Sequence, residues 1–161
     1  MKKETKTILR ASFVQMVSEI DPHFSADPVF ANHPNLFAVR RCVKAPQWQF
    51  VALTFSPSSQ RFFVEVAIAQ TETYPIDHFP MSPNDPLENG SIRFRASQLW
   101  GNIQSGGWLI QKSGGKLPVD SLLLPEGIFN TPQTAMGDVK DRMTKWILPY
   151  LQTFGTLRTA S

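Results

Sequence analysis

Histidine and cysteine side chains could bind a metal or carry acid–base chemistry, but their spacing in this chain follows no metal-site pattern. The chain has three histidines, His23, His33 and His78, and one cysteine, Cys42. None of them has the C-x-x-C or H-x-x-x-H spacing that brings two ligands to one turn or one helix face. Each histidine lies in a proline-rich segment that reads as a loop, where an imidazole is usually solvated or bonded to the backbone. We therefore expect no metal site and no cofactor.

Two glycine-containing segments match catalytic motifs only in part. Gly115-Lys116 resembles the end of a phosphate-binding loop, but Ile110 stands where the first glycine of that motif should be. Ser105 and Ser113 lie beside glycines, yet neither has the first glycine of the G-x-S-x-G pattern of serine hydrolases. The motifs therefore supply no catalytic residue.

One carboxylate, Glu65, lies inside an otherwise apolar stretch of alternating residues. We expect it to pair with an arginine on the same sheet face, such as Arg61, Arg93 or Arg95, because opposite charges across strands stabilise a sheet. The alternative is an enzyme whose acid, histidine and arginine, namely Glu65, His78 and Arg93, meet only in space. A deep pocket lined by these groups would favour the enzyme, and burial as satisfied pairs would favour a binding protein.

The charge distribution argues against nucleic acid as the main partner. The net charge is +3 and the pI is near 9.2, but four of the 16 basic residues and one of the 13 acids lie in the terminal segments. The body therefore holds twelve of each sign, and a neutral body binds phosphate poorly. Weak single-strand binding stays open as a third hypothesis, which requires arginines and tryptophans to lie side by side. The candidates are Arg40, Arg41, Arg93, Arg95, Trp48, Trp100 and Trp108.

Length and composition indicate one domain spanning residues 1–161. Hydrophobic residues make up 42% of the chain and charged residues 18%, which is far from the composition of a disordered protein. A single cysteine excludes an intrachain disulfide, so we expect a reducing compartment, the cytoplasm. The apolar stretches are far shorter than the ~18 residues of a membrane span. The N-terminal segment lacks the apolar region of a signal peptide, so we expect no membrane partner.

Apolar periodicity predicts a helix near each end of the chain. The first spans Thr7–Ile20 and ends at Asp21-Pro22, because the residue before a proline is disfavoured in the α region. The second is capped by Thr131 or Thr134 and should be kinked at Pro149. Its apolar stripe consists of Val139, Met143, Trp146, Ile147, Leu151 and Phe154.

Segments rich in β-branched and aromatic residues predict the strands. The pair Gln47–Phe55 and Arg61–Ala69 should form an antiparallel hairpin across the turn Ser56–Ser59. The full set is Leu36–Val43, Gln47–Phe55, Arg61–Ala69, Ser91–Leu99 and Trp108–Lys112. The expected fold class is α+β, an antiparallel sheet of about five strands packed with an N-terminal and a C-terminal helix. Residues 1–5 and 156–161 are expected to be flexible.

Residues 71–90 form a long proline-rich loop, which resists both helix and strand. Loops of this length inside compact domains often carry function, so we expect a partner surface here; a neutral insertion is the alternative. Aromatic residues dominate interface energetics, which makes Tyr74, Phe79 and Trp100 the expected anchors. A charged rim would consist of Asp77, Asp85 and Glu88.

Three runs of the chain carry a resemblance to a known family. They are WQFVALTFSPSSQRFFVEVAIA, RFRASQLWGNIQSGGWLI and DVKDRMTKWILPYLQTF. Together they resemble the bacterial domain-of-unknown-function family numbered 4304, over nearly the whole chain. That resemblance implies an α+β fold and supplies no catalytic residues. Small bacterial proteins of this kind are often immunity or accessory proteins of toxin systems. We therefore expect a non-enzymatic domain that binds another protein, such as a toxin effector.

Overall fold

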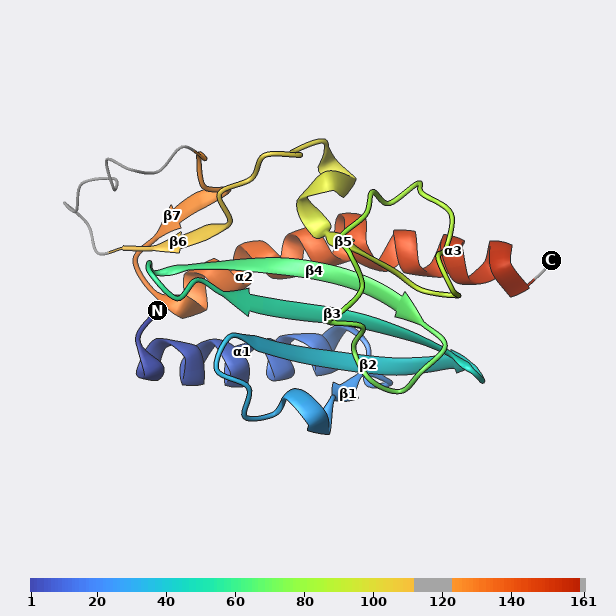
Figure 1. Ribbon diagram of the computed structural model, residues 1–161. Coiled ribbons are helices and arrows are strands. Elements are labelled where there is room, and N and C mark those ends of the chain that lie inside the picture. The colour runs from blue at the N-terminus through green and yellow to red at the C-terminus, as the bar shows by residue number, and fades with distance from the viewer. Residues whose placement is uncertain (112–122, 160–161) are drawn as a thin grey trace.

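The computed structural model describes residues 1–111 and 123–159, in which three α-helices and seven strands form an α+β structure (Figure 1). The helices are α1 (Lys3–Ile20), α2 (Pro132–Arg142) and α3 (Leu148–Thr159). The strands are β1 (Ser25–Ala26), β2 (Leu36–Lys44), β3 (Gln47–Phe55), β4 (Arg61–Ala69), β5 (Ile92–Arg95), β6 (Trp108–Ile110) and β7 (Gly127–Phe129). Short 3-10 turns occupy Pro28–Phe30 and Ala96–Trp100. The predicted fold class is confirmed.

The centre of the sheet is the antiparallel meander β2–β3–β4, three strands of nine residues each. The order is β1-β2-β3-β4-β6-β7, and β5 pairs with the second half of β4 while β6 pairs with its first two residues. The predicted hairpin between β3 and β4 is therefore confirmed. Only β6 and β7 pair in parallel among the described strands.

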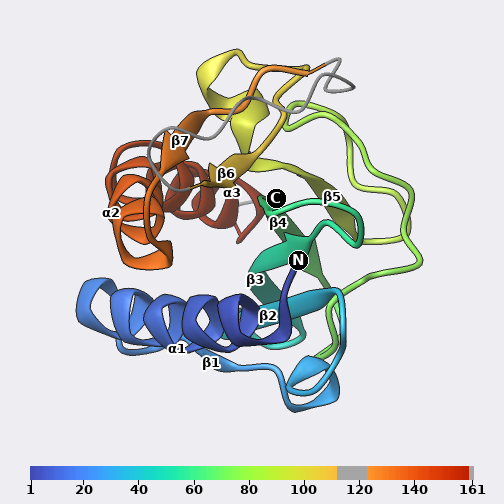
Figure 2. The same cartoon turned by 90° about the vertical axis from the view of Figure 1, so that its left-hand side faces the viewer.

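The two faces of the sheet are covered differently, as Figure 2 shows. Helices α1, α2 and α3 cover one face, where apolar side chains of β2 to β6 form the larger core. The opposite face carries a smaller apolar cluster and lies against the start of the 71–90 loop. Its members are Phe30, Leu36, Ala38, Phe50, Ala52, Ala67, Ala69 and Tyr74.

The strands that the sequence did not predict correctly are short or irregular. The predicted strand Ser91–Leu99 pairs only over Ile92–Arg95, after which the chain turns into a 3-10 helix that Gly101 ends with φ 82°. Strands β1 and β7 were not predicted, because two or three residues carry no readable alternation. Lys112, the last residue of the predicted strand Trp108–Lys112, and Gly115-Lys116 lie outside the described residues.

The start of the C-terminal helix and its passage past Pro149 have causes that are visible in the sequence. Thr131 is the N-cap, and its side chain exchanges hydrogen bonds with Thr134 in a capping box. Pro149 has no N–H to donate to the preceding turn. The chain passes this position through a π-helical segment, Met143–Ile147, in which the Leu148 N–H donates to the Met143 carbonyl. The proline is thus accommodated by a widened turn between α2 and α3.

The chain termini are more regular than expected. Helix α1 begins at Lys3, within the segment 1–5 that was expected to be flexible, and the Met1 amino group donates to the Ser56 carbonyl at 2.8 Å. Helix α3 runs to Thr159, which makes part of the predicted flexible segment 156–161 helical. Residues 160–161 lie outside the described residues.

Candidate functional site

The 71–90 loop runs around the outer edge of β5 and is tied down along its length. The Met81 N–H donates to the Arg93 carbonyl at 2.6 Å, so the loop covers part of the β5 edge. The Tyr150 hydroxyl, on α3, donates to the Pro83 carbonyl at 2.8 Å. Near its end, Glu88 and Ser91 exchange two backbone hydrogen bonds of 3.0 Å. These contacts give the loop one defined path without regular secondary structure.

A buried polar network holds the start of the loop against the sheet. The Arg93 guanidinium pairs with Glu65 through Nε–Oε2 at 2.9 Å and Nη2–Oε1 at 3.3 Å. The Tyr74 hydroxyl donates to Glu65 Oε2. The Tyr74 N–H donates to Oδ2 of the fully buried Asp27 at 3.1 Å. Every buried charge in this network has a partner, which is the condition under which burying charges is tolerated.

Arg93 also fixes the part of the loop that precedes Phe79. Its Nη1 donates to the carbonyl oxygens of Ile76 and His78, both at 3.0 Å. One guanidinium therefore joins the buried Glu65 to two carbonyls of the loop. Phe79 directly follows His78, the second residue whose carbonyl Arg93 binds; these contacts of Arg93 are called the clamp below.

The pKa shifts of Tyr74 and Arg93 favour a structural role for the network. Burial, followed by the charge of Glu65, raises the pKa of Tyr74 well above its usual 10. Burial lowers the pKa of Arg93, but its hydrogen bond to Glu65 and the nearby charges outweigh this and raise it overall. The network is thus a neutral phenol beside a closed ion pair. This matches the expectation that Glu65 pairs with an arginine; the arginine is Arg93, and His78 contributes only its carbonyl to the clamp.

Three predicted rim residues and one predicted anchor lie on the same loop. The Phe79 side chain is 82% exposed, although it lies between fixed neighbours. Asp77 and Glu88 are exposed, and Asp85 is half-buried, with its Oδ2 accepting a hydrogen bond from the Ser82 N–H at 2.9 Å. This group, Asp77, Phe79, Asp85 and Glu88, is called the loop surface below.

Tyr74 and Trp100 do not belong to the loop surface. Tyr74 is 1% exposed, because its ring packs between Phe30 and Phe50 at centroid distances of 6.1 and 5.8 Å. Trp100 is half-buried in a separate cluster, where Arg142 stacks on its ring at 4.8 Å. The expectation that Tyr74 is a surface anchor is corrected, because its buried ring holds the loop from inside. Trp100 is half-buried and lies outside residues 71–90, so its predicted role stays a prediction.

The Trp100 cluster centres on a carboxylate that the sequence did not single out, Glu126. Its Oε1 accepts from Asn102 Nδ2 at 2.8 Å, and its Oε2 accepts from Trp100 Nε1 at 3.2 Å and lies 3.6 Å from Arg142 Nη1. Arg142 also lies 3.8 Å from Asp138, which accepts from the Trp108 indole at 2.7 Å. Of this cluster, only Trp100 and Trp108 were candidates from the sequence, whereas Asp138 and Arg142 are i, i+4 neighbours on α2.

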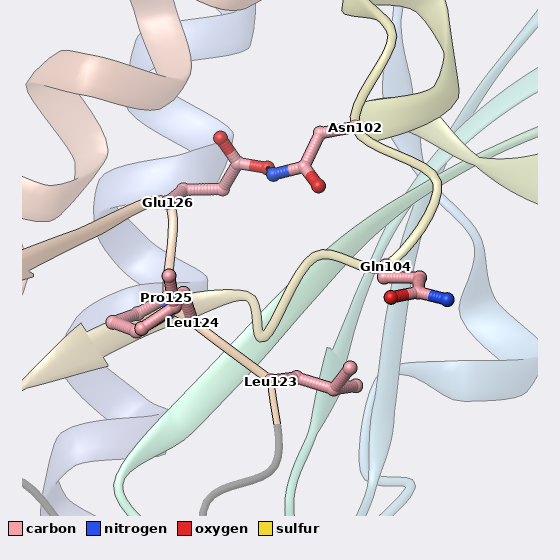
Figure 3. A pocket seen from close by; sticks show the side chains of 6 residues that line it. All are labelled: Asn102, Gln104, Leu123, Leu124, Pro125 and Glu126. Carbon is pink, nitrogen blue, oxygen red and sulfur yellow. Dashed lines mark hydrogen bonds between the residues drawn. The ribbon is translucent and has the colours of Figure 1, made fainter.

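A hollow of about 480 Å³ lies beside Glu126 (Figure 3). Figure 3 shows the Asn102 amide facing the Glu126 carboxylate at one end of the hollow. Both carboxylate oxygens already accept hydrogen bonds from the protein, so Glu126 positions the chain here and is not a free acid. The lining residues are Asn102, Gln104, Leu123, Leu124, Pro125 and Glu126.

The arginines and tryptophans considered for single-strand binding do not form one surface. Arg41 lies on the helix-covered face, where it pairs with Asp21 and stacks on Phe24 at 4.7 Å. Trp108 is buried and stacks on Phe62 at 5.5 Å. Arg40 stacks on Trp48 at 4.9 Å, on the other face. Within the described residues, these arginines and tryptophans therefore form no continuous surface on which bases could stack.

Within the described residues, no three His, Cys, Asp or Glu side chains come together in a way that could hold a metal ion. Over the same ranges, no helix combines the length and the apolar character that crossing a bilayer requires.

The fold and the sites define an α+β domain with a helix-covered antiparallel sheet and a tied-down loop at the edge of the sheet. No protein-family model matches the chain, and no curated protein or solved structure matches it either. The resemblance to family 4304 therefore stays a prediction.

Proposed function

We propose that this chain is a non-enzymatic domain that binds another protein through the loop surface. The observation that carries the proposal is the 82% exposure of Phe79 on a loop held by a buried ion pair. A large apolar side chain that stays exposed on a fixed backbone is typical of interface anchors, because little conformational freedom is lost when it binds.

The charge of the loop supports a partner with a basic surface. Residues 71–90 contain four acids, Glu72, Asp77, Asp85 and Glu88, and no lysine or arginine. The partner should therefore offer an apolar recess for Phe79 that is flanked by basic side chains. Nucleic acid does not fit a surface of this sign, since its backbone is itself anionic.

The resemblance to family 4304 favours a specific form of this function, an immunity or accessory protein that neutralises a bacterial toxin. In this proposal the interaction takes place in the cytoplasm, which agrees with a single cysteine, Cys42, that is exposed and unpaired. No catalytic step is assigned, because Glu65 and Arg93 are already satisfied by each other and by the loop.

The test is an affinity pull-down of the tagged protein from its native lysate, including the products of neighbouring genes. Phe79→Ala is the test variant and Ile103→Ala the matched control, because Ile103 is also a large apolar residue, 77% exposed, and lies outside the loop. We expect one stoichiometric protein to be captured by the wild type and the control, and to be lost with Phe79→Ala. Equal capture by all three would remove the loop surface from the proposal.

A further inference from the structure

The imidazole of His78 lies between two carbonyl oxygens of the same loop. Its Nδ1 is 3.0 Å from the Phe79 carbonyl oxygen, and its Nε2 is 3.3 Å from the Glu88 carbonyl oxygen. A carbonyl oxygen can only accept a hydrogen bond, so each ring nitrogen must donate to satisfy this geometry. A neutral imidazole carries one N–H, whereas the imidazolium carries two. Only the protonated ring can make both hydrogen bonds.

We propose that His78 is a proton-dependent clasp that joins the Phe79 side of the loop to the returning Glu88 side. The inference rests on the proposed function, because it describes the regulation of the same loop surface. The clasp is complete when the imidazole carries two protons, because both ring nitrogens then donate. When the ring loses one of these protons, one of the two hydrogen bonds is lost and the loop loosens.

The longer of the two contacts indicates which hydrogen bond is lost. Nε2 and the Glu88 oxygen are 3.3 Å apart, whereas Nδ1 and the Phe79 oxygen are 3.0 Å apart. The neutral ring should keep its proton at Nδ1, where the geometry is better, and its Nε2 lone pair would then face the Glu88 oxygen. The connection across the loop is thus the one that depends on the second proton.

The elements that hold His78 carry charged groups of both signs. Arg93 of β5 is the nearby cation, since its Nη1 donates to the His78 carbonyl, but it is paired with Glu65 of β4 at 2.9 Å. The loop itself adds the acids Asp77, Asp85 and Glu88. Tyr74, a further titratable group of the network, is neutral because burial raises its pKa. The charged groups on the elements that hold His78 are thus one paired arginine and the acids of its own loop.

Amide hydrogen exchange tests the clasp without a partner. The Met81 and Ser91 N–H groups report on the loop, because they donate to the Arg93 and Glu88 carbonyls. We expect their protection, corrected for intrinsic exchange, to increase about five-fold between about pH 8 and about pH 5.5, which is the effect of roughly one hydrogen bond. His78→Gln, whose amide does not titrate, should remove this increase, and His33→Gln should retain it.

Two outcomes would overturn the clasp: protection that does not change with pH in the wild type, or an increase of the same size in His78→Gln. The result is independent of the pull-down. Loss of the pH effect with Phe79-dependent binding intact would reject only the clasp. A pH effect without Phe79-dependent binding would reject only the proposed function.

Discussion

Glu65 and Arg93 are the residues on which the position of Phe79 depends. Their ion pair is buried, and Arg93 extends it to two carbonyls of the loop. Removing one member of a buried pair leaves the other charge uncompensated, which costs more than the pair contributes to stability. The network therefore acts as one unit, and substitutions within it should affect both stability and the loop.

At this scale, Glu65→Gln should lower the free energy of unfolding by about 3 kcal/mol, because it leaves the buried Arg93 charge unpaired. Urea unfolding measures the change. Glu72→Gln is the matched control, since Glu72 is exposed and its carboxylate lies 4.0 Å from Arg40, so a change below about 0.5 kcal/mol is expected. Similar losses for both variants would contradict a stabilising role for the network.

Tyr74 supplies a pH-dependent prediction at the same scale. In a Tyr150→Phe variant it is the only tyrosine, because the chain has two. Its folded-state pKa lies well above the unfolded value of about 10, so its contribution to stability is complete below pH 10 and is lost as the pH rises further. Absorbance of the phenolate at alkaline pH should increase only together with unfolding. A separate increase near pH 10 in the folded protein would contradict the burial of the hydroxyl.

The sequence predicted part of this residue-scale arrangement. Alternation within the strands placed Glu65 on one face with Arg61, Arg93 and Arg95, but it could not decide which arginine pairs with it. Arg95 is directly opposite Glu65 in the register, yet it stacks on Phe63 at 3.8 Å, and the diagonal Arg93 makes the ion pair. The choice depends on the loop, whose carbonyls complete the hydrogen bonds of Arg93.

At the scale of elements, replacing glycine by alanine should have opposite effects on stability at two positions, Gly107 and Gly137. Gly107, the residue before β6, has φ 74°, and a Cβ there would overlap the carbonyl oxygen of Phe62 in β4. Gly137 lies inside α2, and a Cβ there meets open space. Gly107→Ala should therefore destabilise the protein by more than about 2 kcal/mol. Gly137→Ala should stabilise it by about 0.5–1 kcal/mol. Thermal unfolding of both variants measures the difference, and equal effects would contradict the geometry.

Long periodic elements were predictable from the sequence, and short non-local ones were not. Nine-residue strands and a helix with an apolar stripe repeat their pattern several times, so β2 to β4 and α1 were predicted. Strand β7 has three residues and pairs in parallel with β6, a contact that no local pattern encodes. The widened turn before Pro149 was predicted only as a kink, because the sequence shows the missing donor and not the way in which the helix adapts.

At the scale of the whole molecule, charge is divided between the loop and the remaining chain. The loop holds four acids and no lysine or arginine, while the other residues hold 16 basic and nine acidic side chains. Neutralising the loop with Asp77→Asn and Glu88→Gln should lower the rate of association with a basic partner by about ten-fold at low salt, and less at high salt. Surface plasmon resonance with the captured protein measures the association rate at low and at high salt. Asp141→Asn, an exposed acid on α2, should change neither.

The hydrogen bond from the Met81 N–H to the Arg93 carbonyl also covers part of the exposed edge of β5. An uncovered strand edge is a template on which another chain can add a strand, and many proteins aggregate in this way. By occupying the Arg93 carbonyl, the loop blocks part of this edge. A partner that pulled the loop away from the sheet would expose it to self-association. Selection against aggregation would then favour partners that bind the loop where it lies.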